Sequence, residues 1–245
     1  MHDIESLYEI FRQFPNITID SRCCPPESLF FALKGKNNDG NRFAEKALQN
    51  GAEYAVIDDP DVAAGDRYIV VPDVLTAMQQ LAAYHRRQMK ARIIAVTGTN
   101  GKTTTKELIA TVLAKQYKVL YTERNHNNHI GVPLTLLRLT EEDQFGVIEM
   151  GANHKGEIAS LCDIAQPDFG IITNFGRAHL EGFGSFEGVI EAKTELFDYL
   201  REHKGRVFIN IGNSNIVEKA KGIGNISYGI NNDKADVSGY ITGQN

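Results

Sequence analysis

Cysteine is scarce in this sequence, and the three cysteines that occur fit neither a disulfide framework nor a metal-binding spacing. Cys23 and Cys24 are adjacent in the chain, where two cysteines seldom bridge each other, and the third is Cys162. We therefore expect reduced thiols and a cytoplasmic protein. Residues 1–14 mix charged and apolar side chains at helical spacing, so a signal peptide is not predicted.

Long apolar runs, internal repeats and an excess of positive charge are also missing. No apolar run approaches the length of a membrane span. The formal net charge of −5 argues against a nucleic-acid partner, for which a basic surface would be expected. A hydrophobic content of 42% with 23% charged residues is ordinary for a globular protein, and 245 residues suffice for two modest domains.

Residues 1–88 alternate predicted helices and strands, which indicates a small α/β domain. Apolar spacing predicts a first helix that contains Ile4, Leu7, Tyr8 and Phe11. Strands are predicted over residues 17–19, 29–33, 54–57 and 68–71, and further helices around 43–48 and over 74–89.

Two short polar segments in this domain directly follow predicted strands. Ser21 and Arg22 follow the first strand, and Lys34 follows the second. The ends of strands are where α/β sheets bind anionic ligands. Ordinary turn chemistry accounts for the same residues as well, and composition does not decide between the two interpretations.

Residues 89–245 are organised around a predicted phosphate loop. The apolar run 93–96 predicts a strand, and a helix is predicted over 102–115, with Leu108, Ile109, Val112 and Leu113 on one side. Between them lie Thr97, Gly98, Thr99, Asn100, Gly101, Lys102, Thr103 and Thr104. Backbone N–H groups at a helix start bind phosphate, Lys102 adds charge, and Thr103 can bind Mg²⁺. The strict phosphate-loop pattern is not met, because Val96 stands where its first glycine should be.

A carboxylate and a histidine are predicted to lie beside this loop. Strands are predicted over 119–121, 145–151 and 169–173; Glu149 ends the second, and His179 follows the third. Because parallel strands end at one edge of a sheet, Glu149, His179 and the phosphate loop should meet there. A carboxylate next to nucleotide phosphates requires a cation, so Glu149 is a predicted Mg²⁺ ligand. Taken singly, each residue could equally be a surface glutamate or a satisfied histidine.

The segment 122–133 is rich in amides and contains His126 and His129. A solvated loop and a binding segment explain this composition equally well. Metal binding by the two histidines is not predicted, because no carboxylate or cysteine completes a site nearby.

Lys193 lies in an apolar stripe of a helix predicted over 187–200. Val189, Leu196 and Leu200 fall on the same face at 100° per residue. One interpretation is a lysine whose stem packs and whose ammonium reaches water. The other is a desolvated lysine whose pKa falls, which leaves a nucleophilic neutral amine.

These motifs resemble the Mur ligases, the ATP-dependent amide-bond ligases of peptidoglycan synthesis. Residues 97–103 match the family's own variant of the phosphate loop, which accounts for Val96. Residues 127–133, 148–154 and 178–185 resemble the branch that adds D-alanyl-D-alanine. Residues 20–22 with 29–35 and 39–40 resemble the N-terminal domain shared with the branch that adds the third residue of the peptide, whose sequence differs at 149–154.

The resemblance implies a small UDP-binding α/β domain at 1–88 and a mostly parallel central ATPase domain at 89–245. Residues 98–104 would bind ATP, with Lys102 on its β- and γ-phosphates. Thr103 and Glu149 would hold one Mg²⁺. His179 and Lys193 would serve a second Mg²⁺, with Lys193 carbamylated by CO₂. The substrate-binding residues implied are Ser21, Arg22 and Lys34 for UDP, and Asn127 and Asn128 facing the sugar-peptide.

The resemblance also implies the reaction, a step in cell-wall biogenesis that serves cell shape and division. The terminal carboxylate of UDP-MurNAc-tripeptide attacks the γ-phosphate of ATP to give an acyl phosphate. The amine of D-Ala-D-Ala then displaces phosphate. Lys102, His179 and Lys193 are the implied catalytic residues.

Family members carry a third, C-terminal domain, whereas this chain ends at Asn245, inside the family's central domain. We therefore expect a truncated, monomeric ligase with little or no turnover. Three alternatives remain: a Mur ligase that adds the third peptide residue, a folate-type polyglutamate ligase, and a nucleotide-binding module without catalysis. A folate-type ligase would not be expected to carry Asp20-Ser21-Arg22.

Overall fold

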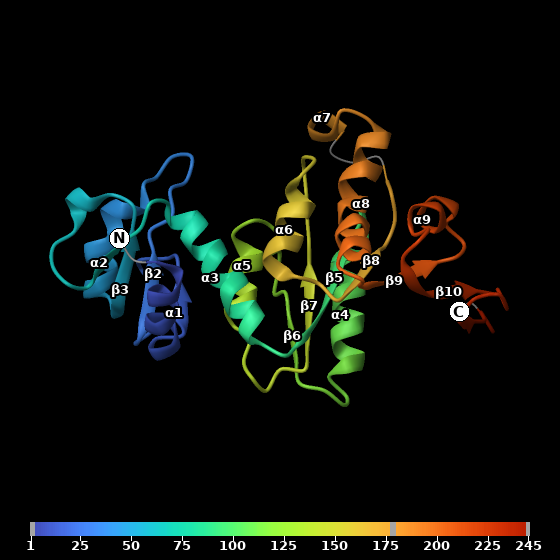
Figure 1. The fold of residues 1–245 in the computed structure, drawn as a ribbon, viewed down its shortest axis with the longest axis horizontal. Coiled ribbons are helices and arrows are strands. Elements are labelled where there is room, and N and C mark those ends of the chain that lie inside the picture. The colour runs from blue at the N-terminus through green and yellow to red at the C-terminus, as the bar shows by residue number, and fades with distance from the viewer. Residues whose placement is uncertain (1–2, 177–179, 244–245) are drawn as a thin grey trace. The chain divides into compact units, whose positions relative to one another are not determined.

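The computed structural model describes residues 3–176 and 180–243, and it divides the chain into two compact units (Figure 1). The first unit comprises Met1–Met89 with Leu136–Arg138, and the second comprises Lys90–Thr135 with Leu139–Asn245. Within the described residues, no helix is long and apolar enough to cross a membrane.

The first unit contains a four-stranded, all-parallel sheet in the order β1-β2-β3-β4. Its strands are β1 (Asn16–Thr18), β2 (Ser28–Phe31), β3 (Ala52–Ile57) and β4 (Tyr68–Val70). Its helices are α1 (Ile4–Gln13), η1 (Gly40–Phe43), α2 (Ala44–Gln49), η2 (Pro60–Val62) and α3 (Val74–Gln88). The small α/β fold predicted for this part of the chain is confirmed.

The core of the first unit forms around β2, all of whose residues are buried. Leu29, Phe30 and Phe31 are apolar in succession because both faces of a parallel sheet are covered. Gly40 passes so close to β2 that a Cβ there would lie 2.4 Å from the carbonyl carbon of Ala32. The polar loop after β2 is thereby held against the sheet.

The second unit is a seven-stranded parallel sheet in the order β11-β10-β9-β8-β5-β7-β6. Its strands are β5 (Arg92–Thr97), β6 (Val119–Tyr121), β7 (Phe145–Glu149), β8 (Phe169–Ile172), β9 (Arg206–Asn210), β10 (Gly224–Ile230) and β11 (Val237–Gly239). β5 lies between β7 and β8, so the loops that follow these three strands leave the sheet side by side. The predicted parallel α/β architecture is confirmed.

The helices of the second unit connect these strands. They are α4 (Lys102–Leu113), α5 (Gly131–Leu136), α6 (Glu157–Ala165), α7 (Leu180–Phe183), α8 (Phe186–Glu202) and α9 (Ser214–Lys219). The predicted stripe on α8 is confirmed, because Val189, Lys193, Leu196 and Leu200 are all buried.

The predicted apolar side of α4 is wrong for two of its four residues. Leu108 and Val112 are 63% and 69% exposed, whereas Ile109 and Leu113 pack against the sheet. The buried residues of this helix are Lys106 and Ala110, which continue the face of Ile109 and Leu113 at helical spacing. A buried lysine therefore takes the place that an apolar residue was expected to fill.

Candidate active site

The phosphate loop connects β5 to α4 through two glycines with positive φ. Gly98 has φ of +142° and Gly101 has φ of +78°. A Cβ at Gly98 would lie 1.9 Å from Oγ1 of Thr173, which follows β8. The loop thus needs glycine at position 98 for its backbone angles and for close approach.

The segment after β8 fixes the tip of the phosphate loop. The side chain of Asn174 binds both backbone groups of Asn100: its Oδ1 accepts from the Asn100 N–H at 3.1 Å, and its Nδ2 donates to the Asn100 carbonyl at 2.9 Å. Thr173 Oγ1 donates to the same carbonyl at 2.7 Å. Thr173 and Asn174 are not among the site residues predicted from the sequence, although two polar residues directly after a buried strand are a usable signal.

Lys102 is the first residue of α4, and its side chain folds back over the loop. Its Nζ donates to the carbonyls of Gly98 at 2.9 Å and Thr99 at 3.1 Å. Thr103 and Thr104, in the first turn of α4, are exposed. A loop with glycines, a lysine and a free helix start can bind the phosphates of a nucleotide.

Glu149 ends β7 beside this loop, in register with Val96 of β5. Its carboxylate is buried, with 2% of the residue exposed, and Oε1 accepts from Asn127 Nδ2 at 2.9 Å. Within the described part of the chain, Oε2 of Glu149 has no hydrogen-bond partner. Because a buried carboxylate oxygen is costly to leave unpaired, Glu149 fits an oxygen-ligated divalent cation such as Mg²⁺.

Lys193 is buried on α8, with 4% of the residue exposed. Its Nζ lies 5.8 Å from the ring centroid of Phe183, and no carboxylate forms an ion pair with it among the described residues. Burial, together with the charge of Lys102, lowers the pKa of Lys193 to about 8. This environment favours the desolvated amine over the lysine that reaches water. His179, the other predicted ligand of the second Mg²⁺, lies outside the described residues.

Asn127 and Asn128 make contacts within the chain. Asn127 binds Glu149, as described above, and its carbonyl accepts from the Gly151 N–H at 2.7 Å. Asn128 Oδ1 accepts from the N–H groups of Ile130 and Gly131 at the start of α5. The structure thus assigns both residues to positioning within the loop, and their binding of substrate stays a prediction.

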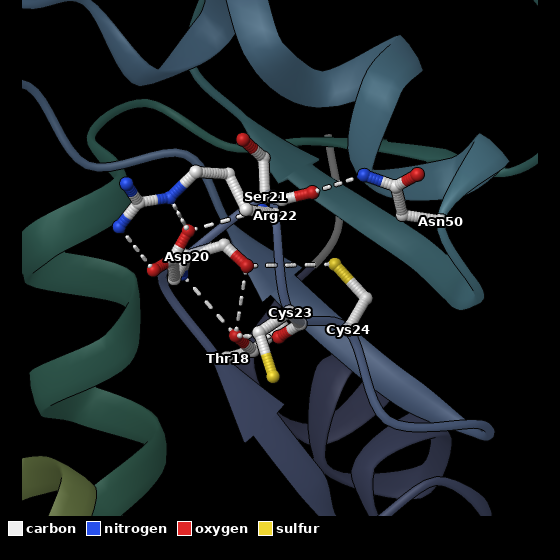
Figure 2. Close-up of polar contacts among 7 residues, drawn as sticks. All are labelled: Thr18, Asp20, Ser21, Arg22, Cys23, Cys24 and Asn50. Carbon is white, nitrogen blue, oxygen red and sulfur yellow. Dashed lines mark hydrogen bonds and ion pairs between the residues drawn. The ribbon is translucent and has the colours of Figure 1, made fainter.

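The polar turn after β1 is closed by an ion pair (Figure 2). Both carboxylate oxygens of Asp20 accept from the guanidinium of Arg22, at 2.9 and 2.7 Å, and these contacts hold the pKa of Asp20 at about 2. The carbonyl of Ser21 accepts from Asn50 Nδ2 at 2.7 Å. Arg22 is exposed, so its charge remains available to an anion.

Lys34 follows β2, the neighbour of β1, and is held by a buried acid. Its Nζ lies 2.8 Å from Asp58 Oδ1, and this ion pair raises the pKa of Lys34. Asp58 also accepts from Asn41 Nδ2 at 2.7 Å and from the Val74 N–H at 3.3 Å. Because β1 and β2 are parallel, Ser21, Arg22 and Lys34 follow strand ends at the same edge of this sheet.

Two family models match the chain. The Mur ligase middle domain matches residues 96–244, and the catalytic domain of the Mur ligase family matches residues 13–86. The first match contains the phosphate loop, Glu149 and Lys193, and the second contains the turns after β1 and β2.

Named relatives agree with these matches. The UDP-N-acetylmuramoyl-tripeptide–D-alanyl-D-alanine ligase of Bacillus subtilis is 41% identical over 87% of this chain and 47% of its own length. Its Escherichia coli counterpart is 44% identical over 81% of this chain and 43% of its own length. The crystal structure of MurF ligase from Thermotoga maritima in complex with ADP matches with a TM-score of 0.81 at 29% identity, over 94% of this chain and 52% of that one. The chain spans about half the length of these relatives, and it belongs to the Mur ligase family.

Proposed function

We propose that this chain provides the nucleotide site and the UDP site of an ATP-dependent ligase that adds D-alanyl-D-alanine to UDP-MurNAc-tripeptide. The observation that carries the proposal is the edge formed by β5, β7 and β8, where the phosphate loop lies beside a buried carboxylate oxygen that has no partner in the described residues. The names of the relatives supply the substrates. The ADP complex of a relative supports nucleotide binding by this chain.

In this proposal the phosphate loop binds ATP through its backbone N–H groups and Lys102. Lys102 exchanges its bonds to the Gly98 and Thr99 carbonyls for the β- and γ-phosphates. Thr103 and Glu149 hold the cation. Mg²⁺, when bound, neutralises charge that develops on the transferred phosphoryl group. Asn127 keeps one Glu149 oxygen occupied, so that the other is directed to the cation.

We also propose that Lys193 carries a carbamate that serves a second Mg²⁺ together with His179. The neutral amine attacks CO₂, an N–C bond forms, and the nitrogen gives up a proton, so that a cation becomes an anion. A pKa of about 8 leaves an appreciable fraction of neutral amine near neutral pH. The carbamate would be seen as an extra carbon resonance after addition of ¹³CO₂ with Mg²⁺. Its absence from the wild-type chain, or its presence in Lys193→Met, would contradict this assignment.

The first unit would hold the UDP part of the substrate through Ser21, Arg22 and Lys34. The positions of the three residues after adjacent parallel strands, and the positive charges of Arg22 and Lys34, support this role. The free thiols of Cys23, Cys24 and Cys162 support a cytoplasmic location.

The proposed reaction is tested by incubating the chain with ATP, Mg²⁺, UDP-MurNAc-tripeptide and D-Ala-D-Ala. We expect binding of the UDP substrate and of ATP, with pentapeptide formation slower than for a full-length relative. Product made from UDP-MurNAc-dipeptide and a diamino acid instead would favour the branch that adds the third residue. Nucleotide binding without any binding of the UDP substrate would favour a nucleotide-binding module and overturn the ligase proposal.

A further inference from the structure

Lys106 is a fully buried lysine on α4, one helical turn beyond Lys102. Lysine is seldom fully buried unless it is paired. Its Nζ donates to Oε1 of Glu107 and to the carbonyl of Thr122, both at 2.6 Å. Neither Glu107 nor Thr122 belongs to the phosphate loop, so the role of this amine depends on what these two residues contact in turn.

Thr122 is the residue at which the chain leaves β6. Its N–H donates to the carbonyl of Val147 at 3.0 Å, as in a parallel ladder. If the ladder continued, the Thr122 carbonyl would accept from the N–H of Glu149. Instead, the Glu149 N–H donates to Thr122 Oγ1 at 3.0 Å, and the carbonyl accepts from Lys106.

This exchange fixes the position of Glu149 through the segment 122–127. Thr122 holds the backbone N–H of Glu149, and Asn127, at the other end of the segment, holds Oε1 of its carboxylate. Thr122 and Glu149 are both buried. A chain of two hydrogen bonds therefore runs from Lys106 through Thr122 to Glu149.

We propose that Lys106 is a positioning residue for the cation site: by binding the Thr122 carbonyl, it ends the β6–β7 ladder at Thr122 and sets the loop that aims Glu149 at the metal. The inference rests on the proposed role of Glu149 as a Mg²⁺ ligand. A methionine of similar length would fill the same space without the cost of burying an amine. What methionine could not provide is the hydrogen bond from Lys106 to the Thr122 carbonyl.

The test measures binding of Mn²⁺ to the 245-residue chain in the presence of ADP, by electron paramagnetic resonance of free Mn²⁺. Lys106→Met should weaken Mn²⁺ binding by about tenfold, as does loss of other residues that support metal ligands. The affinity for ADP without metal should be unchanged, because the phosphate loop is intact. Lys115→Met, which removes an exposed lysine just after α4, is the matched control and should bind Mn²⁺ as the wild type does.

A second pair of variants separates positioning from simple stabilisation. In a Glu149→Gln background, Lys106→Met should cause no further loss of Mn²⁺ affinity, because the ligand that it positions is gone. Thr122→Val interrupts the same chain of contacts and should also weaken Mn²⁺ binding, and it serves if Lys106→Met does not fold.

When the wild-type chain binds Mn²⁺, three outcomes would overturn the inference. They are full Mn²⁺ affinity in a folded Lys106→Met, full affinity in Thr122→Val, and equal losses from Lys106→Met with and without Glu149→Gln. If the wild-type chain binds ADP but not Mn²⁺, both this inference and the proposed cation site are wrong. Normal Mn²⁺ binding by the wild type and Lys106→Met alike would contradict the inference alone.

Discussion

At the scale of single residues, two ionisable side chains near the phosphate loop, Glu149 and Lys193, are buried. Glu149 keeps a buried carboxylate oxygen without a partner among the described residues, and Lys193 keeps a buried amine beside an aromatic ring. Each arrangement costs stability unless a ligand compensates it. Costly polar groups gathered beside a phosphate loop are therefore better explained by ligand binding than by folding.

Lys102 provides the first prediction at this scale. Lys102→Ala should leave the fold intact and weaken ATP binding at least about tenfold, or about 1.4 kcal/mol, because a charge next to the phosphates is lost. Calorimetric titration with ATP and Mg²⁺ measures the change, and circular dichroism checks the fold. Lys115→Ala is the control. Equal ATP affinities for Lys102→Ala and the wild type would rule out the assigned role.

Lys193 provides a prediction about pH. Its pKa is lowered from 10.5 in the unfolded chain to about 8 in the folded chain, so the unfolded chain binds more protons between these values. The free energy of unfolding should therefore rise with pH across this range, by up to about 3 kcal/mol at 1.4 kcal/mol per pKa unit.

Lys193→Met removes this contribution, so the variant should exceed the wild type in stability at pH 7, and the difference should shrink by pH 10. Urea unfolding of both chains in buffers free of CO₂ and divalent cations measures the difference. A difference that does not change with pH would mean that Lys193 titrates normally.

At the scale of elements, the order of the strands explains how much of the site could be predicted. Apolar runs identified β5, β7 and β8, and parallel pairing then placed Glu149 beside the phosphate loop. The contacts of Thr173 and Asn174 could not be predicted, because they depend on a register that sets Ile172 opposite Thr97 and hence Thr173 near Gly98. Apolar spacing also predicted the wrong buried face of α4, because the buried residue Lys106 makes hydrogen bonds instead of apolar contacts alone.

Gly98 tests this packing of two loops. Gly98→Ala should destabilise the chain, because φ is +142° and its Cβ would meet Thr173, with overpacking alone costing about 1–3 kcal/mol. Gly65→Ala is the matched control, since Gly65 has φ of +116° but no atom within 4 Å of the added Cβ. Thermal melting should show a larger decrease in melting temperature for Gly98→Ala than for Gly65→Ala. Equal decreases in melting temperature would show that backbone strain, and not contact with Thr173, accounts for the effect at Gly98.

The sheet edge of the first unit carries a separate prediction. Lys34→Met should weaken binding of UDP by about tenfold, whereas Lys36→Met, an exposed lysine two residues further on, should not. Amide resonances near Ser21 and Lys34 should move when UDP is added to the whole chain. Shifts confined to residues of the second unit would refute the assignment.

At the scale of the whole molecule, we propose that the two α/β units bind different ligands. The first offers positive charge after β1 and β2, and the second offers a phosphate loop with a carboxylate. Acyl transfer also needs the amine to be positioned and water to be excluded. The chain spans about half the length of its relatives, so binding of ATP and of the UDP substrate is the first property to measure.

The most direct test of the central claim is calorimetric titration of the chain with ADP, with and without Mg²⁺, in the wild type and in Glu149→Gln. We predict that Mg²⁺ tightens ADP binding to the wild type, and that Glu149→Gln loses this gain while its metal-free affinity stays the same. A Glu149→Gln variant that gains as much affinity from Mg²⁺ as the wild type would contradict the claim that β5, β7 and β8 build a magnesium–nucleotide site.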